Sequence, residues 1–279
     1  MSRLESLAPR AAVCTKCSGQ RYVTRAGAAQ AEALRCETCF SVCSTCDGRG
    51  YSFVSDWTGA LVASPCDCLE LDARIALYNG AQLPRRYATA GLTAGTEDVN
   101  DSVRAARVEC YKRTVGFTVG DRGVGLTGPV GVGKTHLMAG LIRALTLENG
   151  VPCLFVEFTH LLAELREGFE RGAGAADAIA RAVDVPVLVI DELGKGLSTE
   201  WQMATLDELV SKRYNSQVTT CFTSNFSVAR PARSGPTSRE RFESASLEDR
   251  IGARMASRLA EMCDIIAIDG PDYRRRGGA

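Results

Sequence analysis

The chain has 279 residues, a length that suggests about two domains, and 45% of them are hydrophobic, which is enough for a substantial core. Acidic and basic residues balance at 33 each, so no overall attraction to nucleic acid or membrane is expected. No apolar run is long enough to span a membrane, and the first residues lack the apolar centre of a signal peptide. We therefore expect a cytoplasmic protein without membrane contact.

Eight of the twelve cysteines lie between positions 14 and 68, in closely spaced pairs. The pairs are Cys14 and Cys17, Cys36 and Cys39, Cys43 and Cys46, and Cys66 and Cys68. A C-x2-C turn places two thiolates on one side of a metal, and a second pair completes a tetrahedron. Taken in order, the pairs are separated by 18 and 19 residues within two similar sets. The spacing therefore predicts two structural zinc sites in tandem.

Other uses of these cysteines remain open. The pairing could be crossed, with Cys36 and Cys39 joined to Cys43 and Cys46. Redox dithiols, an iron–sulfur cluster and a catalytic zinc are further alternatives. Structural zinc is favoured because four thiolates leave zinc no open position, and because redox C-x2-C motifs usually occur singly. The remaining cysteines are isolated among apolar neighbours and are expected to be buried: Cys110, Cys153, Cys221 and Cys263.

The apolar content is low at the start of the chain, so metal binding would supply much of the folding free energy there. We predict a zinc-binding region over residues 1–80 and a larger domain over 81–279. A helix is expected near Leu71–Asn79, a linker over Gly80–Arg86 and another helix near Val103–Phe117. A Pro-, Arg- and Ser-rich stretch at 227–247 is expected to be a basic loop.

From position 123 onward, short apolar runs alternate with helical patterns. The predicted strands are Gly123–Thr127, Cys153–Phe158, Val185–Ile190, Val218–Thr223 and Ile265–Ile268. The predicted helices lie near 134–148, 159–170, 175–182, 200–214 and 248–261. This alternation predicts an α/β fold with a parallel sheet and helices on both faces.

A glycine-rich segment between the first predicted strand and helix fits the phosphate-binding pattern G-x-x-x-x-G-K-[ST]. Its residues are Gly128, Pro129, Val130, Gly131, Val132, Gly133, Lys134 and Thr135. Glycine permits the tight turn, and the N-terminus of the following helix directs N–H groups at phosphate. Lys134 would contact the β- and γ-phosphates, and the Thr135 hydroxyl would ligate Mg²⁺. The segment predicts nucleoside triphosphate binding.

Polar residues end two later strands. Asp191 and Glu192 follow an apolar strand, where Asp191 would hold Mg²⁺ and Glu192 would polarise the attacking water. Asn225 follows the next strand and could sense the γ-phosphate, although it could equally be a turn residue.

Three arginines are spaced at i, i+4 and i+8: Arg250, Arg254 and Arg258. That spacing places them on one helical face. Such a stripe is usually solvated, but in an oligomeric ATPase one such arginine reaches the γ-phosphate of a neighbouring subunit.

The order of these motifs resembles the DnaC/DnaI helicase-loader family, which also includes the IstB transposition helpers. The resemblance rests on GPVGVGKTH, VLVIDELG, TSN, RIGARMASRL and the segment Ile268–Arg274, and it spans about residues 82–276. It implies an AAA+ domain with a five-stranded sheet of order 5-1-4-3-2. Few residues follow the last predicted strand, so the lid of most AAA+ proteins is expected to be minimal or absent.

The resemblance also implies residue roles. Lys134 and Thr135 match Walker A, Asp191 and Glu192 match Walker B, and Asn225 matches sensor 1. Arg258 best matches the arginine finger, with Arg254 beside it. Arg274 matches a late arginine that acts as a sensor, and His136 is typical of the family.

The resemblance implies ATP hydrolysis, head-to-tail self-association and loading of a hexameric replicative helicase onto single-stranded DNA, with the zinc region docking the helicase. The candidate DNA contacts are Arg166, Arg171, Arg230, Arg233, Arg239 and Arg241. One alternative is an IstB-like helper of transposition that binds duplex DNA and recruits a transposase. Another is a non-enzymatic zinc adaptor with an ATP switch, which the Asp191–Glu192 pair disfavours.

Overall fold

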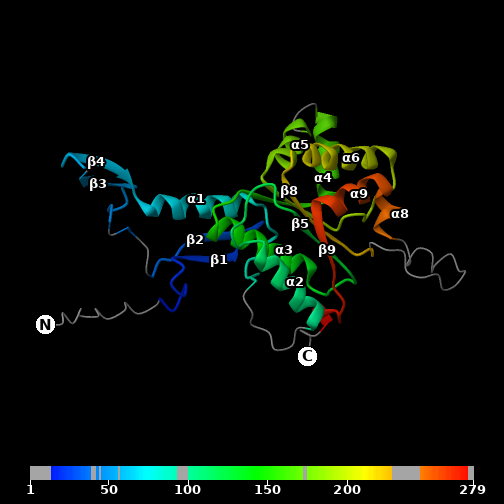
Figure 1. Cartoon of the computed structure of the whole chain (residues 1–279), viewed down its shortest axis with the longest axis horizontal. Coiled ribbons are helices and arrows are strands. Elements are labelled where there is room, and N and C mark those ends of the chain that lie inside the picture. The colour runs from blue at the N-terminus through cyan, green and yellow to red at the C-terminus, as the bar shows by residue number, and fades with distance from the viewer. Residues whose placement is uncertain are drawn as a thin grey trace, which may run out of the picture.

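The computed structural model describes residues 14–38, 42–43, 45–55, 57–92, 100–171, 175–227 and 246–275. A parallel five-stranded sheet lies at its centre (Figure 1). The strands are β5 (Gly123–Thr127), β6 (Cys153–Glu157), β7 (Val187–Asp191), β8 (Thr219–Ser224) and β9 (Cys263–Ala267). Their spatial order is β6-β7-β8-β5-β9, which confirms the predicted order 5-1-4-3-2.

Helices cover both faces of this sheet, as predicted. They are α2 (Asp101–Lys112), α3 (Lys134–Arg143), α4 (Phe158–Arg171), α5 (Ala175–Asp184), α6 (Glu200–Asn215), α8 (Leu247–Ile251) and α9 (Ala253–Met262). Alternate strand residues point to opposite faces. Val187 and Val189 accordingly pack with α2 and α3 in one core cluster, whereas Leu188 and Ile190 pack with α4, α5, α6 and α9 in another.

Several element boundaries differ from the predicted ones. The helix expected over Val103–Phe117 begins at Asp101, because the Asn100 side chain caps it by accepting a hydrogen bond from the Val103 N–H, and it ends at Lys112. The helix expected to run to position 148 ends as α3 at Arg143 and continues as a π-helix, η2 (Ala144–Glu148). Two short 3-10 turns, η1 (Arg85–Tyr87) and η3 (Tyr273–Arg275), complete the described part.

The described residues of the N-terminal region form two antiparallel hairpins and one helix. The first hairpin pairs β1 (Tyr22–Ala26) with β2 (Ala31–Arg35), and the second pairs β3 (Tyr51–Ser55) with β4 (Leu61–Pro65). Helix α1 (Asp67–Gly80) follows them. The second hairpin lies at the end of α1 away from the central sheet (Figure 1).

The first hairpin shares the core of the α/β domain. Tyr22, Ala31 and Ala33 are buried in the same cluster as the inner residues of α3. The Asn79 carboxamide on α1 accepts a hydrogen bond from the Ala33 N–H at 2.7 Å. Since this packing crosses residue 80, the hydrophobic core is continuous there, and the domain boundary at that position stays a prediction.

The segment Gly80–Arg86, expected to be a linker, is partly packed into the core, although Gly80, Gln82, Arg85 and Arg86 are exposed. Ala81 and Leu83 are fully buried, and the Ala81 carbonyl accepts a hydrogen bond from the Phe155 N–H on β6 at 2.8 Å. No local pattern predicts this packing, because a short mixed segment containing a proline is typical of a connection between elements.

A buried arginine connects α5, α6 and β8 through hydrogen bonds. Arg213 on α6 is completely buried, and no carboxylate among the described residues pairs with it. Its guanidinium donates to the Thr220 hydroxyl and to backbone carbonyls in the last turn of α5, just after α5 and at the start of β8. Burial lowers its pKa to about 10. These hydrogen bonds hold the charge where a counter-ion would otherwise be needed. Among the described helices, none has the length and apolarity that a membrane crossing requires.

Candidate functional site

A pocket of about 580 Å³ opens beside the glycine-rich loop, at the carboxyl ends of β7 and β8. This edge of a parallel sheet is where α/β proteins bind ligands. The lining residues are Tyr87, Arg107, Val130, Gly131, Gly133, Lys134, Thr135, His136, Leu137, Glu192, Thr223, Asn225, Tyr273 and Arg274. Most of the predicted nucleotide-site residues therefore meet in one cavity.

The loop adopts a conformation that glycine makes possible. Gly128, Gly131 and Gly133 all have positive φ, and Gly133 is the residue before the first turn of α3. A Cβ on Gly131 would lie 1.9 Å from an Asp272 carboxylate oxygen, so no side chain fits there. Val132 is buried beneath the loop. The free N–H groups at the start of α3 can therefore approach a phosphate closely.

The side chain of Lys134, the first residue of α3, folds back onto the glycine-rich loop. Its Nζ donates to the carbonyl oxygens of Gly128 at 2.7 Å and Pro129 at 2.6 Å. Burial lowers the pKa of Lys134 to about 8, although nearby Asp191 counteracts this. A phosphate in the pocket would stabilise the charged ammonium.

The Asp191 carboxylate, at the end of β7, accepts hydrogen bonds from two threonine hydroxyls. Thr135 donates to Asp191 Oδ1 at 2.9 Å, and Thr223 donates to the same oxygen at 2.6 Å. Asp191 is buried, and this burial raises its pKa, partly offset by the two hydroxyl donors. Asp191 and Thr135 together offer the oxygen ligands that Mg²⁺ prefers.

Glu192 lies in an unusual backbone conformation with φ of 56°. Its N–H donates to the Thr223 hydroxyl at 3.0 Å, and its carboxylate forms an ion pair with Lys195. Non-glycine residues at positive φ are uncommon and are found at functional sites. The side chain lines the pocket while its charge is paired.

The segment after β9 closes one side of the pocket. The Tyr273 N–H donates to the Gly131 carbonyl at 3.1 Å, and Tyr273 and Arg274 both line the cavity. Sequence reasoning identified Arg274 but missed Tyr273, Tyr87, Arg107 and Thr223. The position of Thr223, two residues before Asn225 on a strand next to β7, could have indicated its role.

The two candidate finger arginines lie outside the pocket, on α9. The Arg258 guanidinium contacts the Asp207 carboxylate at 3.3 Å and also donates to the Ser211 hydroxyl, so it is held against α6. Arg254 is 3.9 Å from the same carboxylate, with 70% of its side chain exposed. Neither side chain reaches the nucleotide pocket of its own chain.

The candidate DNA-binding arginines are only partly described. Arg166 is exposed on α4, beside Trp201, in a separate surface depression. Arg171 is the last residue of α4, and its side chain lies outside the described part. Arg230, Arg233, Arg239 and Arg241 lie outside the described residues.

The cysteines gather into two clusters in the order of the sequence. Cys43, Cys46, Cys66 and Cys68 are buried, with their sulfur atoms within 4.8 Å of one another. Cys14, Cys17 and Cys36 form a second cluster, whereas Cys39 lies outside the described residues.

The surroundings of the complete cluster act differently on its cysteines: hydrogen bonds lower the pKa of Cys43, whereas burial raises the pKa of Cys68. The Gly50 N–H donates to the Cys46 sulfur at 3.3 Å, and backbone N–H donors at Thr45 and Cys46 lower the pKa of Cys43 to about 6. Four converging cysteines fit a tetrahedral metal such as zinc. The four remaining cysteines are buried, as predicted.

The sheet order, the glycine loop and the carboxylates after β7 define an AAA+ P-loop ATPase domain. The chain belongs to the family described as "IstB-like ATP binding protein", which residues 101–278 match.

Individual relatives are similar to parts of the chain. Protein YqaM of Bacillus subtilis (strain 168), described as uncharacterized, is 28% identical over 130 residues, or 44% of this chain and 40% of YqaM. A crystal structure of the DnaC helicase loader is 27% identical with a TM-score of 0.57, covering 66% of this chain and 99% of that one. A crystal structure of DnaI shares the fold at 23% identity and a TM-score of 0.54, covering 68% and 93%.

Proposed function

We propose that this chain is an ATP-dependent loader of a hexameric replicative helicase onto single-stranded DNA. The observation that carries the proposal is the similarity to the DnaC helicase loader over 99% of that chain, at 27% identity, together with an intact nucleotide pocket. Similarity of fold alone would not be enough, because one fold supports many functions.

In this proposal the pocket binds ATP with Mg²⁺. Lys134 contacts the β- and γ-phosphates, and Thr135 and Asp191 hold the metal, which neutralises phosphate charge. Glu192 orients the attacking water once it leaves Lys195, and Asn225 and Arg274 contact the γ-phosphate side of the pocket. Replacing Glu192 by Gln should abolish hydrolysis but keep ATP binding.

We further propose that the two cysteine clusters bind zinc, one through Cys43, Cys46, Cys66 and Cys68 and the other through Cys14, Cys17, Cys36 and Cys39. Zinc would supply folding free energy to the second hairpin in particular, because the first hairpin also packs against the core of the α/β domain.

The second hairpin is proposed as the helicase-docking surface. It carries exposed apolar side chains on both strands and at its tip: Tyr51, Phe53, Val54, Trp57, Leu61 and Val62. Trp57 is 96% exposed. Exposed patches of this kind mark protein-binding sites.

Self-association would be head-to-tail, with ATP at each junction. Arg254 is the more accessible candidate for the neighbouring γ-phosphate, because Arg258 would first have to leave Asp207 and Ser211. A trans arginine stabilises charge in the transition state.

The test is co-elution of the full chain with the replicative helicase of its host, in the presence of ATP. A variant with Phe53→Ser and Trp57→Ser should lose the complex while retaining ATP binding. Truncation at residue 82 is unsuitable, because it would remove Tyr78 and Ala81 from the shared core. Absence of a complex with the wild-type, zinc-loaded chain would contradict the proposal.

A second candidate is an ATPase helper of transposition, which the match to the IstB-like family favours. It would prefer duplex over single-stranded DNA and would bind a transposase. Comparing the affinities for the two DNA forms with ATP present separates the candidates.

A further inference from the structure

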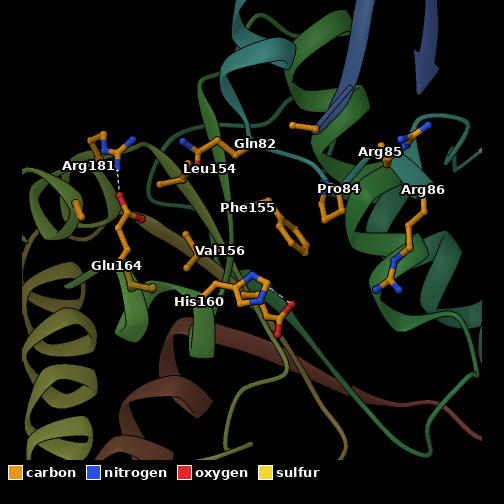
Figure 2. A pocket seen from close by; sticks show the side chains of 14 residues that line it. Gln82, Pro84, Arg85, Arg86, Leu154, Phe155, Val156, His160, Glu164 and Arg181 are labelled. Carbon is orange, nitrogen blue, oxygen red and sulfur yellow. Dashed lines mark hydrogen bonds and ion pairs between the residues drawn. The ribbon is translucent and has the colours of Figure 1, made fainter. Parts of the chain in front are cut away.

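A groove of about 440 Å³ follows the outer edge of β6, on the side away from β7 (Figure 2). Leu154, Phe155 and Val156 form its floor. Arg85 and Arg86 stand on one wall, and Glu164 and Arg181 stand on the other (Figure 2). The groove contains no residue of the nucleotide pocket.

The edge of β6 is left open by a turn in the chain before it. The Phe155 N–H donates to the Ala81 carbonyl at 2.8 Å, which starts a strand-like contact. Gln82 then has φ of 58°, and Pro84 forms an isolated bridge with Gln30 instead. The contact therefore stops after one hydrogen bond.

Two backbone groups of β6 face the groove as a result. Alternate residues of a strand direct their backbone groups to opposite neighbours. The Val187 N–H on β7 donates to the Pro152 carbonyl. The backbone hydrogen-bonding groups of the alternate residues Pro152, Leu154 and Val156 therefore point toward β7. The Phe155 C=O and the Glu157 N–H point the other way, and no described residue hydrogen-bonds with either group.

The charges of the two walls differ. Arg85 and Arg86 are exposed and no described carboxylate pairs with them; Arg85 donates only to the Ala28 carbonyl at 3.5 Å, and Arg86 lies 4.7 Å from the centre of the Tyr87 ring. The opposite wall is neutralised by the Arg181–Glu164 ion pair at 2.8 Å. One wall therefore carries two uncompensated positive charges.

From this geometry we infer that the groove binds an extended acidic peptide of a partner protein, added as a strand to the edge of β6. The peptide backbone donates to the Phe155 C=O and accepts from the Glu157 N–H, its apolar side chains cover Leu154 and Val156, and a carboxylate faces Arg85 and Arg86. Nucleic acid fits less well, because Phe155 is too buried to stack on a base.

The test uses a fluorescein-labelled peptide of alternating Glu and Val residues and the full chain, measured by fluorescence anisotropy without ATP. Arg85→Glu combined with Arg86→Glu should weaken binding about tenfold or more, since it reverses the charge of one wall. Arg104→Glu, at an arginine with 63% of its side chain exposed on α2, is the matched control and should leave binding unchanged. Thermal melting checks that both variants are folded.

Two further measurements test whether the peptide pairs with the backbone of β6. Hydrogen exchange at the Glu157 amide should slow when the peptide is added, and a peptide N-methylated at alternate residues, with the same side chains, should bind about tenfold more weakly. An unchanged Glu157 amide, or equal binding by the charge-reversed variant, would overturn the inference. It would also be overturned if a single-stranded oligonucleotide displaced the peptide and lost affinity in the same double variant. Because neither ATP nor helicase is present, the result is independent of the proposed function.

Discussion

The Thr223 hydroxyl on β8 donates to Asp191 Oδ1 at 2.6 Å and accepts from the Glu192 N–H at 3.0 Å. One side chain on a neighbouring strand therefore positions both acidic residues after β7. Since Thr135 donates to the same Asp191 oxygen at 2.9 Å, the other carboxylate oxygen is the one left for a metal. These three hydrogen bonds connect Thr135, at the end of the glycine-rich loop, with β7 and β8.

Thr223→Val should lower ATP hydrolysis about tenfold, because it removes a donor to a buried carboxylate and leaves the Glu192 N–H without its acceptor. It should also cost about 1–3 kcal/mol of stability. Steady-state hydrolysis and urea unfolding measure the two effects. Thr205→Val is the control: Thr205 is also buried and donates to a backbone carbonyl, at 2.8 Å, but lies away from the pocket. A normal rate in Thr223→Val would show that the threonine is not needed.

Lys195→Met should raise the basal rate of ATP hydrolysis, because Glu192 would no longer be held in an ion pair. A free carboxylate can accept a hydrogen bond from the attacking water. Single-turnover hydrolysis with bound ATP measures this step directly. Lys212→Met removes a comparable exposed ion pair, with Glu208 at 2.6 Å, and should have no effect. A slower rate in Lys195→Met would instead give Lys195 a positive role.

Nucleotide affinity should fall as the pH rises above about 8, the pKa of Lys134. Bound phosphate favours the ammonium, so above this pH binding takes up a proton, and affinity changes by at most about tenfold per pH unit. The folding stability of the nucleotide-free protein changes with pH in the opposite direction. The folded pKa lies below that of an unfolded lysine, so Lys134 contributes stability as the pH rises from about 8 toward 10.5. Calorimetry of ATP binding at pH 9 in two buffers of different ionisation enthalpy measures the proton uptake; no uptake would contradict the assignment.

The two cysteine clusters should respond differently to mutation. Replacing Cys43 and Cys46 with Ser should remove about one zinc per chain and leave the melting of the ATPase core nearly unchanged. Replacing Cys17 and Cys36 should also remove about one zinc, but should lower the melting temperature, since Tyr22 shares the core and Arg143 on α3 lies 6.0 Å from its ring. Metal analysis and calorimetry test both variants. Equal melting temperatures would mean that the first hairpin is not part of the ATPase core.

Much of the central fold could be predicted from local patterns. The strand before the glycine loop and the helix that begins at Lys134 follow from an apolar run, a turn that requires glycine and a new helical period. The strand order needed the family resemblance, because hydrophobic alternation alone predicts a parallel sheet but not the order of its strands.

The remaining features depend on contacts between distant segments. Ala81 meets Phe155 and Tyr273 meets Gly131 across long stretches of sequence, and no local pattern marks either pair. The arginine stripe illustrates the same limit. Its spacing predicted one helical face for Arg250, Arg254 and Arg258, but the chain breaks at Gly252, so Arg250 lies on α8 and only the other two share α9. Whether Arg258 points to a neighbouring subunit or to Asp207 depends on the packing of α6 against α9.

Loading of the replicative helicase onto closed circular single-stranded DNA tests the central claim most directly, because a circle has no end onto which a helicase can thread. The amount of helicase on the circle should rise when the wild-type chain and ATP are present, and should fall to the level without loader for the variant with Phe53→Ser and Trp57→Ser. An amount that does not rise with the wild-type, zinc-loaded, ATP-bound protein would contradict the loader assignment.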